Sequence, residues 1–306
     1  MINQSIRMEK VISKSNSAYG IFMMVSGTIF GSLMIVFVKY LKHLPVMEIV
    51  FFRNIFIMLI IPFILKKEKI PIWGINKPLI LFRSMCSVIG AITYYYTAKN
   101  MILTDAVTIK QLSPIFILFM AAIFLKEKIN IQKIVIFFLA FLGALFIIKP
   151  GFNLDIFPAM VGLFGTIITA AAHISLRRLR LTDHPLVIVN YFGYIGGLVA
   201  LSVMLFQRNF VVPDALSILF ILMLGLTGLG MQVTVIKAYQ FAPTSLVSFY
   251  LYLQIIFTTI IGVIFFNEVP GLFSIFGASI IIITGYFNYQ FSKKEENEKN
   301  SSVNIS

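Results

Sequence analysis

The sequence predicts an all-α polytopic membrane protein with ten transmembrane helices, arranged as a five-plus-five inverted repeat with both termini in the cytoplasm. The prediction rests on an apolar composition, a series of apolar runs of helical length, and a repeat between the two halves. The chain is 59% hydrophobic and 12% charged, with a mean hydropathy of +0.94. Soluble domains carry about 25% charged residues, so a soluble fold of this size would lack polar surface.

Each apolar run is long enough to cross a bilayer as a helix. A hydrocarbon core about 30 Å thick needs roughly 20 residues at 1.5 Å per residue. Hydrocarbon supplies no water, so each span must bond its own backbone groups, and the lack of alternation excludes a β-barrel. The predicted spans are residues 18–38, 47–65, 78–98, 103–124, 131–148, 156–176, 186–206, 216–238, 245–266 and 270–291.

Lysine and arginine orient these helices. They gather in the N-terminal segment, in the alternate loops at 66–77, 126–133 and 177–180, and in the C-terminal tail. Because basic loops stay in the cytoplasm, both termini are predicted to lie there. The predicted organisation is a cytoplasmic segment 1–17, a first five-helix unit 18–148, a second five-helix unit 156–291 and a disordered cytoplasmic tail 292–306.

The charge distribution and the cysteine content exclude several classes of binding partner. The formal net charge of +13 flanks the apolar runs instead of forming one basic face, so no nucleic acid is expected. Cys86 is the only cysteine, which excludes an intrachain disulfide and a thiolate metal site. No cofactor or metal is therefore predicted, and the expected partners are a small organic solute and the lipid bilayer.

The two halves share a pattern. The stretches Ala98–Glu127 and Ala238–Glu268 each begin with a small residue that closes one helix, cross a short turn, and end the next span with an acid. Because each half has an odd number of spans, the second half enters the membrane in the opposite sense. Inverted repeats of this kind are typical of carriers with a site near the midplane.

Several motifs resemble a known family. They include "LPVMEIVFFRN" at 44–54, "TDAVTIKQLSPIF" at 104–116 and "FFNEVPGLFSIFGA" at 265–278. The chain resembles the EamA-type members of the drug/metabolite transporter superfamily, and "EIVFFR" and "LTDAVT" resemble the branch that includes S-adenosylmethionine uptake carriers. The resemblance implies a non-enzymatic carrier of the plasma or inner membrane, which moves a small organic metabolite through a central cavity by alternating access.

Lys110 is the most informative residue because it lies inside the predicted span 103–124. It lies roughly 10 Å from the outer end at 1.5 Å per residue, which is more than a lysine stem covers by snorkelling. Two roles stay open: contact with a carboxylate of the solute, or an ion pair or hydrogen bonds within the bundle. Pro114 removes a helix hydrogen bond and predicts a kink.

Other polar side chains recur at helical spacing. Arg83, Gly90 and Tyr94 align on the span 78–98, and isolated amides such as Gln232 either contact the solute or join helices. An amino-acid-like or S-adenosylmethionine-like solute with a carboxylate suits this set. The predicted substrate-binding residues are Lys110, Gln111, Tyr94, His173, Gln232, Tyr250 and Gln254.

Charged and small residues elsewhere have structural interpretations. Arg53 follows Glu48 on one span and is expected to form an ion pair or to cap a carbonyl. Glu268, like Glu127 in the other half, is expected to anchor a loop. The small-xxx-small pairs predict close helix packing within the chain, with a homodimer as the alternative; they are Gly27 with Gly31 and Gly193 with Gly197.

All acidic residues fall at span ends or in loops. Proton-coupled carriers usually hold a carboxylate or histidine in the membrane, and only His173 remains as a relay. Exchange or facilitated movement is therefore preferred, and a proton-coupled drug or metabolite exporter is the alternative. A membrane-embedded enzyme is disfavoured because the histidines are scattered, and a channel would differ in that its flux does not saturate.

Overall fold

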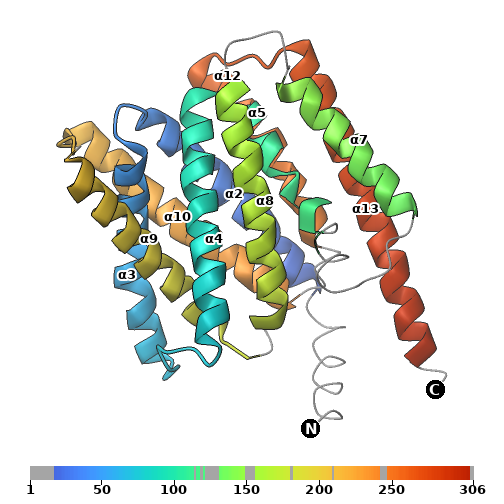
Figure 1. Cartoon of the computed structure of the whole chain (residues 1–306), viewed down its shortest axis with the longest axis horizontal. Coiled ribbons are helices and arrows are strands. Elements are labelled where there is room, and N and C mark those ends of the chain that lie inside the picture. The colour runs from blue at the N-terminus through green and yellow to red at the C-terminus, as the bar shows by residue number, and fades with distance from the viewer. Residues whose placement is uncertain are drawn as a thin grey trace.

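The regular elements in the described part of the chain are all helices (Figure 1). The computed structural model describes residues 17–113, 115–117, 120, 131–148, 156–179, 182–208, 210–241 and 247–303. The elements are α2 (Ser17–Tyr40), α3 (Val46–Lys67), α4 (Lys77–Asn100), α5 (Leu103–Lys110), α7 (Ile131–Ile148), α8 (Ile156–Leu179), α9 (Pro185–Gln207), α10 (Ala215–Phe241), the 3₁₀ helix η1 (Ser248–Tyr252), α12 (Leu253–Phe266) and α13 (Leu272–Val303).

Most of the predicted spans appear as continuous helices. Within the described residues, seven helices are long and apolar enough to cross a membrane, namely α2, α3, α4, α8, α9, α10 and α13. Two shorter apolar helices cover 134–147 in α7 and 250–266 in η1 and α12. The sequence therefore located these elements correctly to within a few residues.

Two predicted spans, 103–124 and 245–266, are not continuous α-helices. The first stops at Lys110, and the Leu112 N–H bonds to the carbonyl of Ile109 in a 3₁₀-like turn. Pro114 lies four residues beyond Lys110 and has no N–H to donate to the Lys110 carbonyl, which explains why the α-helix ends there. The second span begins as η1 before it becomes α12.

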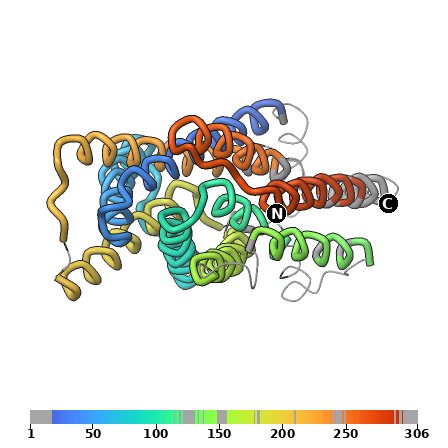
Figure 2. Tube along the Cα trace, turned by 90° about the horizontal axis from the view of Figure 1, so that it is seen from above, coloured from blue at the N-terminus to red at the C-terminus, as the bar shows by residue number. Residues whose placement is uncertain are grey.

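Helices from the two halves pack in antiparallel pairs. α3 packs on α9, α5 on α12 and α7 on α13, while α2 pairs with α10 and α4 with α8. The antiparallel sense is clear for α3 and α9, where Asn54 lies against Gly196 and Ile57 against Gly193. Figures 1 and 2 show α7 and α13 side by side at one edge of the bundle.

Glycines permit the closest of these approaches. A Cβ on Gly27 would lie 2.7 Å from a Val235 side-chain atom, and one on Gly193 would lie 2.5 Å from Ile57. Gly31 and Gly197 face Met231 and Met58 in the same way. The small-xxx-small pairs therefore serve helix packing within the chain, as the sequence predicts.

The C-terminal segment differs from the prediction of a disordered tail. α13 continues to Val303, so residues 292–303 are helical. The segment is rich in lysine and glutamate, which are good helix formers and pair favourably four residues apart. The predicted cytoplasmic segment 1–17, except Ser17, lies outside the described residues, as do Pro114 with its predicted kink, Glu127 and residues 304–306.

Packing of α7 on α13 predicts a selective effect of one methyl group. A Cβ on Gly277 would lie 2.5 Å from the backbone oxygen of Gly143, whereas a Cβ on Gly262 would meet only Glu268 atoms at 4.0 Å. Gly277→Ala should lower stability by about 1–3 kcal/mol because backbone cannot move aside. Gly262→Ala is the matched control and should be neutral. Equal thermal unfolding midpoints for the two variants would contradict this packing.

Candidate functional site

Lys110 ends α5 and contacts an aromatic ring of α4. Its Nζ lies 3.8 Å from the centroid of the Tyr94 ring, which is the geometry of a cation–π contact. Tyr94 is buried, and its hydroxyl has no hydrogen-bond partner among the described residues. No ion pair of Lys110 is found in the same part of the chain, where Lys39 with Glu268 forms the single salt bridge. The ammonium therefore has a ring beneath it and no counter-ion.

A small cavity lies beside Lys110, between α4, α5 and α8. Its wall includes Tyr94, Lys110, Thr166 and Thr169, together with glycines of α4 and α8. The volume open to the centre of a water molecule is about 10 Å³, which is room for one water at most. The cavity is thus too small to hold an organic solute in this conformation.

Glycine and threonine line this cavity because α4 and α8 approach closely there. A Cβ on Gly90 would lie 2.1 Å from the Thr169 hydroxyl oxygen, and one on Gly165 would lie 1.8 Å from that of Thr93. The Thr169 hydroxyl donates to the Gly165 carbonyl at 2.8 Å. Small side chains therefore let the two helices approach closely, and the Thr169 hydroxyl at this contact is bonded within its own helix.

The breaks in the two discontinuous spans meet through a pair of amides. Gln111 follows the end of α5, and its Nε2 donates to the Leu251 carbonyl in η1 at 3.0 Å and to Oε1 of Gln254 at 3.1 Å. Gln254 is 2% exposed, and its Nε2 has no partner within the described residues. The predicted residues Gln111 and Gln254 are thus brought together, and they leave one buried amide donor unused.

His173 lies one helical turn beyond the cavity wall on α8. Its Nδ1 lies 2.8 Å from the Thr169 carbonyl, and since a carbonyl only accepts, Nδ1 carries the hydrogen. The positive charges of Lys110 and Arg83 both act on this ring. His173 therefore lies one turn from Thr169, a residue of the cavity wall that also includes Lys110.

Gln232 and Tyr250 are the predicted site residues that do not join this cluster. Tyr250 packs against the apolar cluster of Met24, Ala238 and Val247. Gln232 is partly exposed on α10, and it forms no hydrogen bond with Lys110 or Gln254 in the part of the chain that the structure describes. Helical spacing placed Tyr250 on a stripe with Gln254, whereas Gln232 was predicted as an isolated amide near the midplane. Neither pattern specifies which neighbouring helix faces the side chain.

Arg53 has a different environment from the one the sequence predicts. Its guanidinium carbon lies 4.9 Å from the Phe192 ring centroid, and its Nε has no partner among the described residues. Glu48 instead accepts from the Val211 N–H at 3.2 Å. Residues five apart do not share a helix face, so the predicted ion pair of Glu48 with Arg53 is wrong. Arg53 is a buried cation that sequence reasoning assigned to structure alone.

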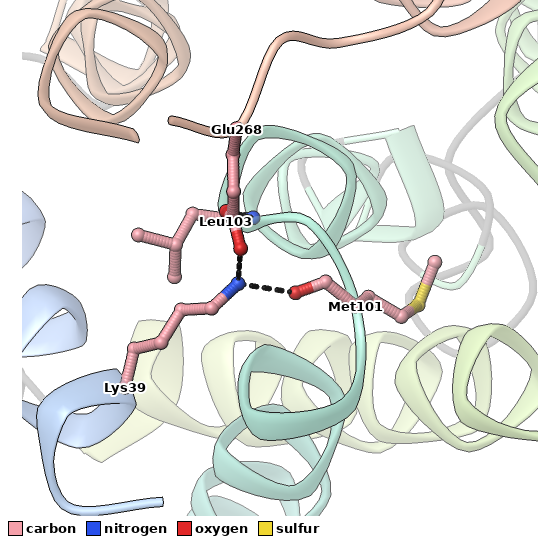
Figure 3. A network of polar contacts seen from close by, with 4 residues as sticks. All are labelled: Lys39, Met101, Leu103 and Glu268. Atoms are coloured by element: carbon pink, nitrogen blue, oxygen red, sulfur yellow. Dashed lines mark hydrogen bonds and ion pairs between the residues drawn. The ribbon is translucent and has the colours of Figure 1, made fainter. Parts of the chain in front are cut away.

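A polar network connects the end of α2, the start of α5 and the segment that follows α12 (Figure 3). Lys39 at the end of α2 forms an ion pair with Glu268 and donates to the Met101 carbonyl at 2.8 Å. The second carboxylate oxygen of Glu268 accepts from the Leu103 N–H at 3.0 Å. Glu268 thus anchors the chain around the start of α5, the loop-anchoring role that the sequence predicts.

An aromatic layer lies on the same side as this network. The Tyr40 ring centroid is 4.8 Å from those of both Phe220 and Phe266, and Lys39 lies 5.7 Å from the Phe266 centroid. Such ring contacts contribute packing beyond their buried area. Residues from α2, α10 and α12 therefore seal the predicted outer end with rings and one ion pair.

The sequence pattern of the EamA-like transporter family matches residues 18–149 and again 157–289. The chain belongs to the EamA-like transporter family. Two copies of the family unit cover nearly all of the helical part. The chain is consequently a multi-pass protein of the cell membrane and a transporter of solutes, and enzymes are not expected in this family.

Curated relatives include transporters of different named solutes. A pseudopaline exporter of Pseudomonas aeruginosa is 30% identical over 243 residues, which cover 78% of this chain and 84% of the relative. An S-adenosylmethionine uptake transporter of Rickettsia conorii is 25% identical over 270 residues, covering 86% and 90%. Solute carrier family 35 member G1 of Mus musculus is 27% identical over 281 residues, covering 87% and 76%.

The fold itself has been solved in a distant chain. One crystal structure superposes with a TM-score of 0.69 at 12% sequence identity, covering 92% of this chain and 100% of the other. At this identity the likeness concerns the fold alone.

The network at Glu268 predicts a measurable coupling with Lys39. Glu268→Gln leaves Lys39 without its counter-ion and should lower stability by about 1–3 kcal/mol. Adding Lys39→Met should recover most of that loss, since the unpaired cation is then absent. Thermal unfolding of the two single variants and the double variant measures the coupling. The exposed Glu68 gives the control Glu68→Gln, and additive losses would contradict the coupling.

Proposed function

We propose that the chain carries a small carboxylate-bearing metabolite across the membrane by alternating access, with Lys110 as the anchor of the carboxylate. The observation that carries the proposal is an ammonium on a polar cavity wall, over the Tyr94 ring, with no acid partner among the described residues. Charged groups in spanning helices persist where they face a functional interior. An anionic solute supplies the missing counter-charge.

The charge distribution supports an anion over a cation. Arg53 acts electrostatically on Lys110, and no acid is among the described groups whose charge acts on it. The described acids instead bind groups near helix ends, such as Glu48 at Val211 and Glu268 at Lys39. A cationic solute group placed beside Lys110 would meet repulsion, whereas a carboxylate meets attraction.

The packing scheme supports a five-plus-five inverted repeat with termini on one side. Helices at equivalent places in the two halves pack as antiparallel pairs, α3 with α9, α5 with α12 and α7 with α13. The other two pairs are α2 with α10 and α4 with α8. Replacing each helix by its equivalent in the other half turns the first of these pairs into the second. A two-fold axis in the membrane plane produces this scheme, because it reverses each helix as it maps one half onto the other.

The proposed mechanism follows from the contacts that join the two halves at the predicted outer end. Lys39 and Glu268 join α2 to the segment after α12 at the predicted outer end, and the cavity inside that seal is small. Opening requires this network to separate and α4 to move from α8, while α5 and η1, already irregular, absorb the change in direction. The structure corresponds in this scheme to an outward-closed state.

Direction and coupling remain part of the proposal. The relatives include both a named exporter and named uptake transporters, so carriage is proposed without a fixed direction. Exchange or facilitated movement fits buried acids that lie in the first turns of their helices, as Glu48 and Asp105 do, and not near the middle of a span. The alternative, a proton-coupled exporter of drugs or metabolites, requires His173 to take up a proton while Lys110 and Arg83 act on it.

Replacing Lys110 tests the anchor. Lys110→Met keeps a flexible chain of similar length and removes the charge. The affinity for a carboxylate-bearing ligand should therefore fall by at least about tenfold, which is the scale of one charge-assisted hydrogen bond. A thermal-shift screen of the purified protein with amino acids, nucleosides and S-adenosylmethionine measures it. Lys42→Met, at an exposed position, is the control. Unchanged ligand affinity in Lys110→Met would overturn the anchor.

A pH gradient distinguishes the two modes of coupling. In proteoliposomes, exchange or facilitated movement predicts solute counterflow that does not need a proton gradient. Proton-driven accumulation that His173→Ala abolishes would replace this proposal with the proton-coupled alternative. Counterflow that persists in His173→Ala without a proton gradient would agree with exchange or facilitated movement, because that mode needs no proton relay.

A further inference from the structure

A second buried cation lies on the α4–α8 interface. Arg83 is 7% exposed, and neither its Nε nor its Nη1 has a hydrogen-bond partner in the part of the chain that the structure describes. A buried guanidinium without a carboxylate is unfavourable, because the charge loses its hydration and gains nothing in return. Folding alone does not explain why a side chain with five donors is held there.

Arg83 shares a helix face with the cavity wall. It lies about two turns from Gly90 and three turns from Tyr94 at 3.6 residues per turn, so the three residues follow one stripe of α4. Gly90 and Tyr94 line the cavity beside Lys110. Arg83 therefore continues the same polar track toward the predicted cytoplasmic end of α4.

The opposite wall of the track is α8. Thr169 lines the cavity and faces Gly90, and His173 follows one turn later. Both Lys110 and Arg83 act electrostatically on His173, with no acid among the described groups that do so. Lys110 and Arg83 are thus two cations on this interface, and His173 lies on its α8 side with its Nδ1–H bonded to the Thr169 carbonyl.

We propose that Arg83 is a second anion-binding position and that the solute is a dicarboxylate, with one carboxylate on Lys110 and the other on Arg83. The inference rests on the proposed function of Lys110 and adds the second charge of the solute. A guanidinium presents paired N–H donors that match both oxygens of one carboxylate. Along α4, Tyr94 and Arg83 are about 16 Å apart at 1.5 Å per residue, so a solute that reaches both cations is a long diacid.

Diacids and their monomethyl esters test the second position. The probes are succinate, adipate and suberate, each compared with its own monomethyl ester, which keeps the length and removes one charge. Ligand affinity of the purified full-length protein is measured by thermal shift and calorimetry. The longer diacids should bind at least about tenfold tighter than their esters, the value of one charge-assisted hydrogen bond.

Variants assign the two charges. Arg83→Gln should abolish the preference for the diacid while leaving the affinity for the ester unchanged, and Arg83→Lys should keep part of the preference. Lys110→Met should weaken both ligands. Arg178→Gln, at an exposed position of α8, is the control and should change neither affinity.

The outcomes separate the two proposals. If Arg83→Gln leaves the diacid preference intact, or if the unmodified protein shows no preference, the second position is overturned while the Lys110 anchor stands. If Arg83→Gln removes the preference but Lys110→Met changes nothing, the Lys110 anchor fails, while Arg83 still binds one carboxylate of the solute. If no carboxylate binds to the unmodified protein, both proposals are overturned.

Stability without ligand distinguishes a ligand-binding arginine from a structural one. Removing an unpaired buried charge should raise the thermal unfolding midpoint of ligand-free Arg83→Gln, because functional groups are often held at a cost to stability. A structural arginine would lower it instead. A lower midpoint together with an unchanged diacid preference would assign Arg83 to the fold and overturn the inference.

Discussion

The central constraint on this molecule is positive charge held inside an apolar bundle. Arg53, Arg83 and Lys110 lie on three different helices, and no described residue forms an ion pair with any of them. The described acids are used elsewhere, mostly at helix ends. A cation transferred from water into a low-dielectric interior needs compensation, and ring faces supply only part of it at Tyr94 and Phe192. In the proposed function, an anionic solute supplies the remainder of the compensation.

A second constraint acts on the backbone. Within a membrane each N–H and carbonyl must be bonded inside the protein, so an irregular segment is tolerated only where other protein groups cover it. The two irregular segments satisfy this by meeting: the Gln111 amide donates to the Leu251 carbonyl in η1. The cost of breaking two helices is thereby limited, and the chain gains two points where its direction can change close to the charged site.

Sequence reasoning located the long spans because apolar length alone decides them. It also selected Lys110, since a lysine at that depth has few explanations. It did not predict that Tyr94 would be the ring beneath it or that Gln111 would reach Gln254, because such contacts depend on which helices pack together. Tyr250 shows the limit from the other side: its stripe is polar, yet its neighbours are Met24, Ala238 and Val247. The absence of an ion pair between Arg53 and Glu48 could have been predicted from their spacing, because residues five apart lie on different faces of a helix.

In the proposed mechanism, the ion pair of Lys39 with Glu268 at the predicted outer end must be weak enough to separate when the solute binds. The side chains of Lys39 and Glu268 are 11% and 18% exposed, so water reaches the pair and its net contribution is a few kcal/mol at most. Reversing a two-state equilibrium from 1:99 to 99:1 requires a difference of about 5.5 kcal/mol. In the proposed mechanism, the compensation of two buried cations by a diacid supplies an interaction of that scale, and only conformations whose cavity admits the solute gain it. A seal much stronger than one ion pair would leave the binding of a small anion unable to open it.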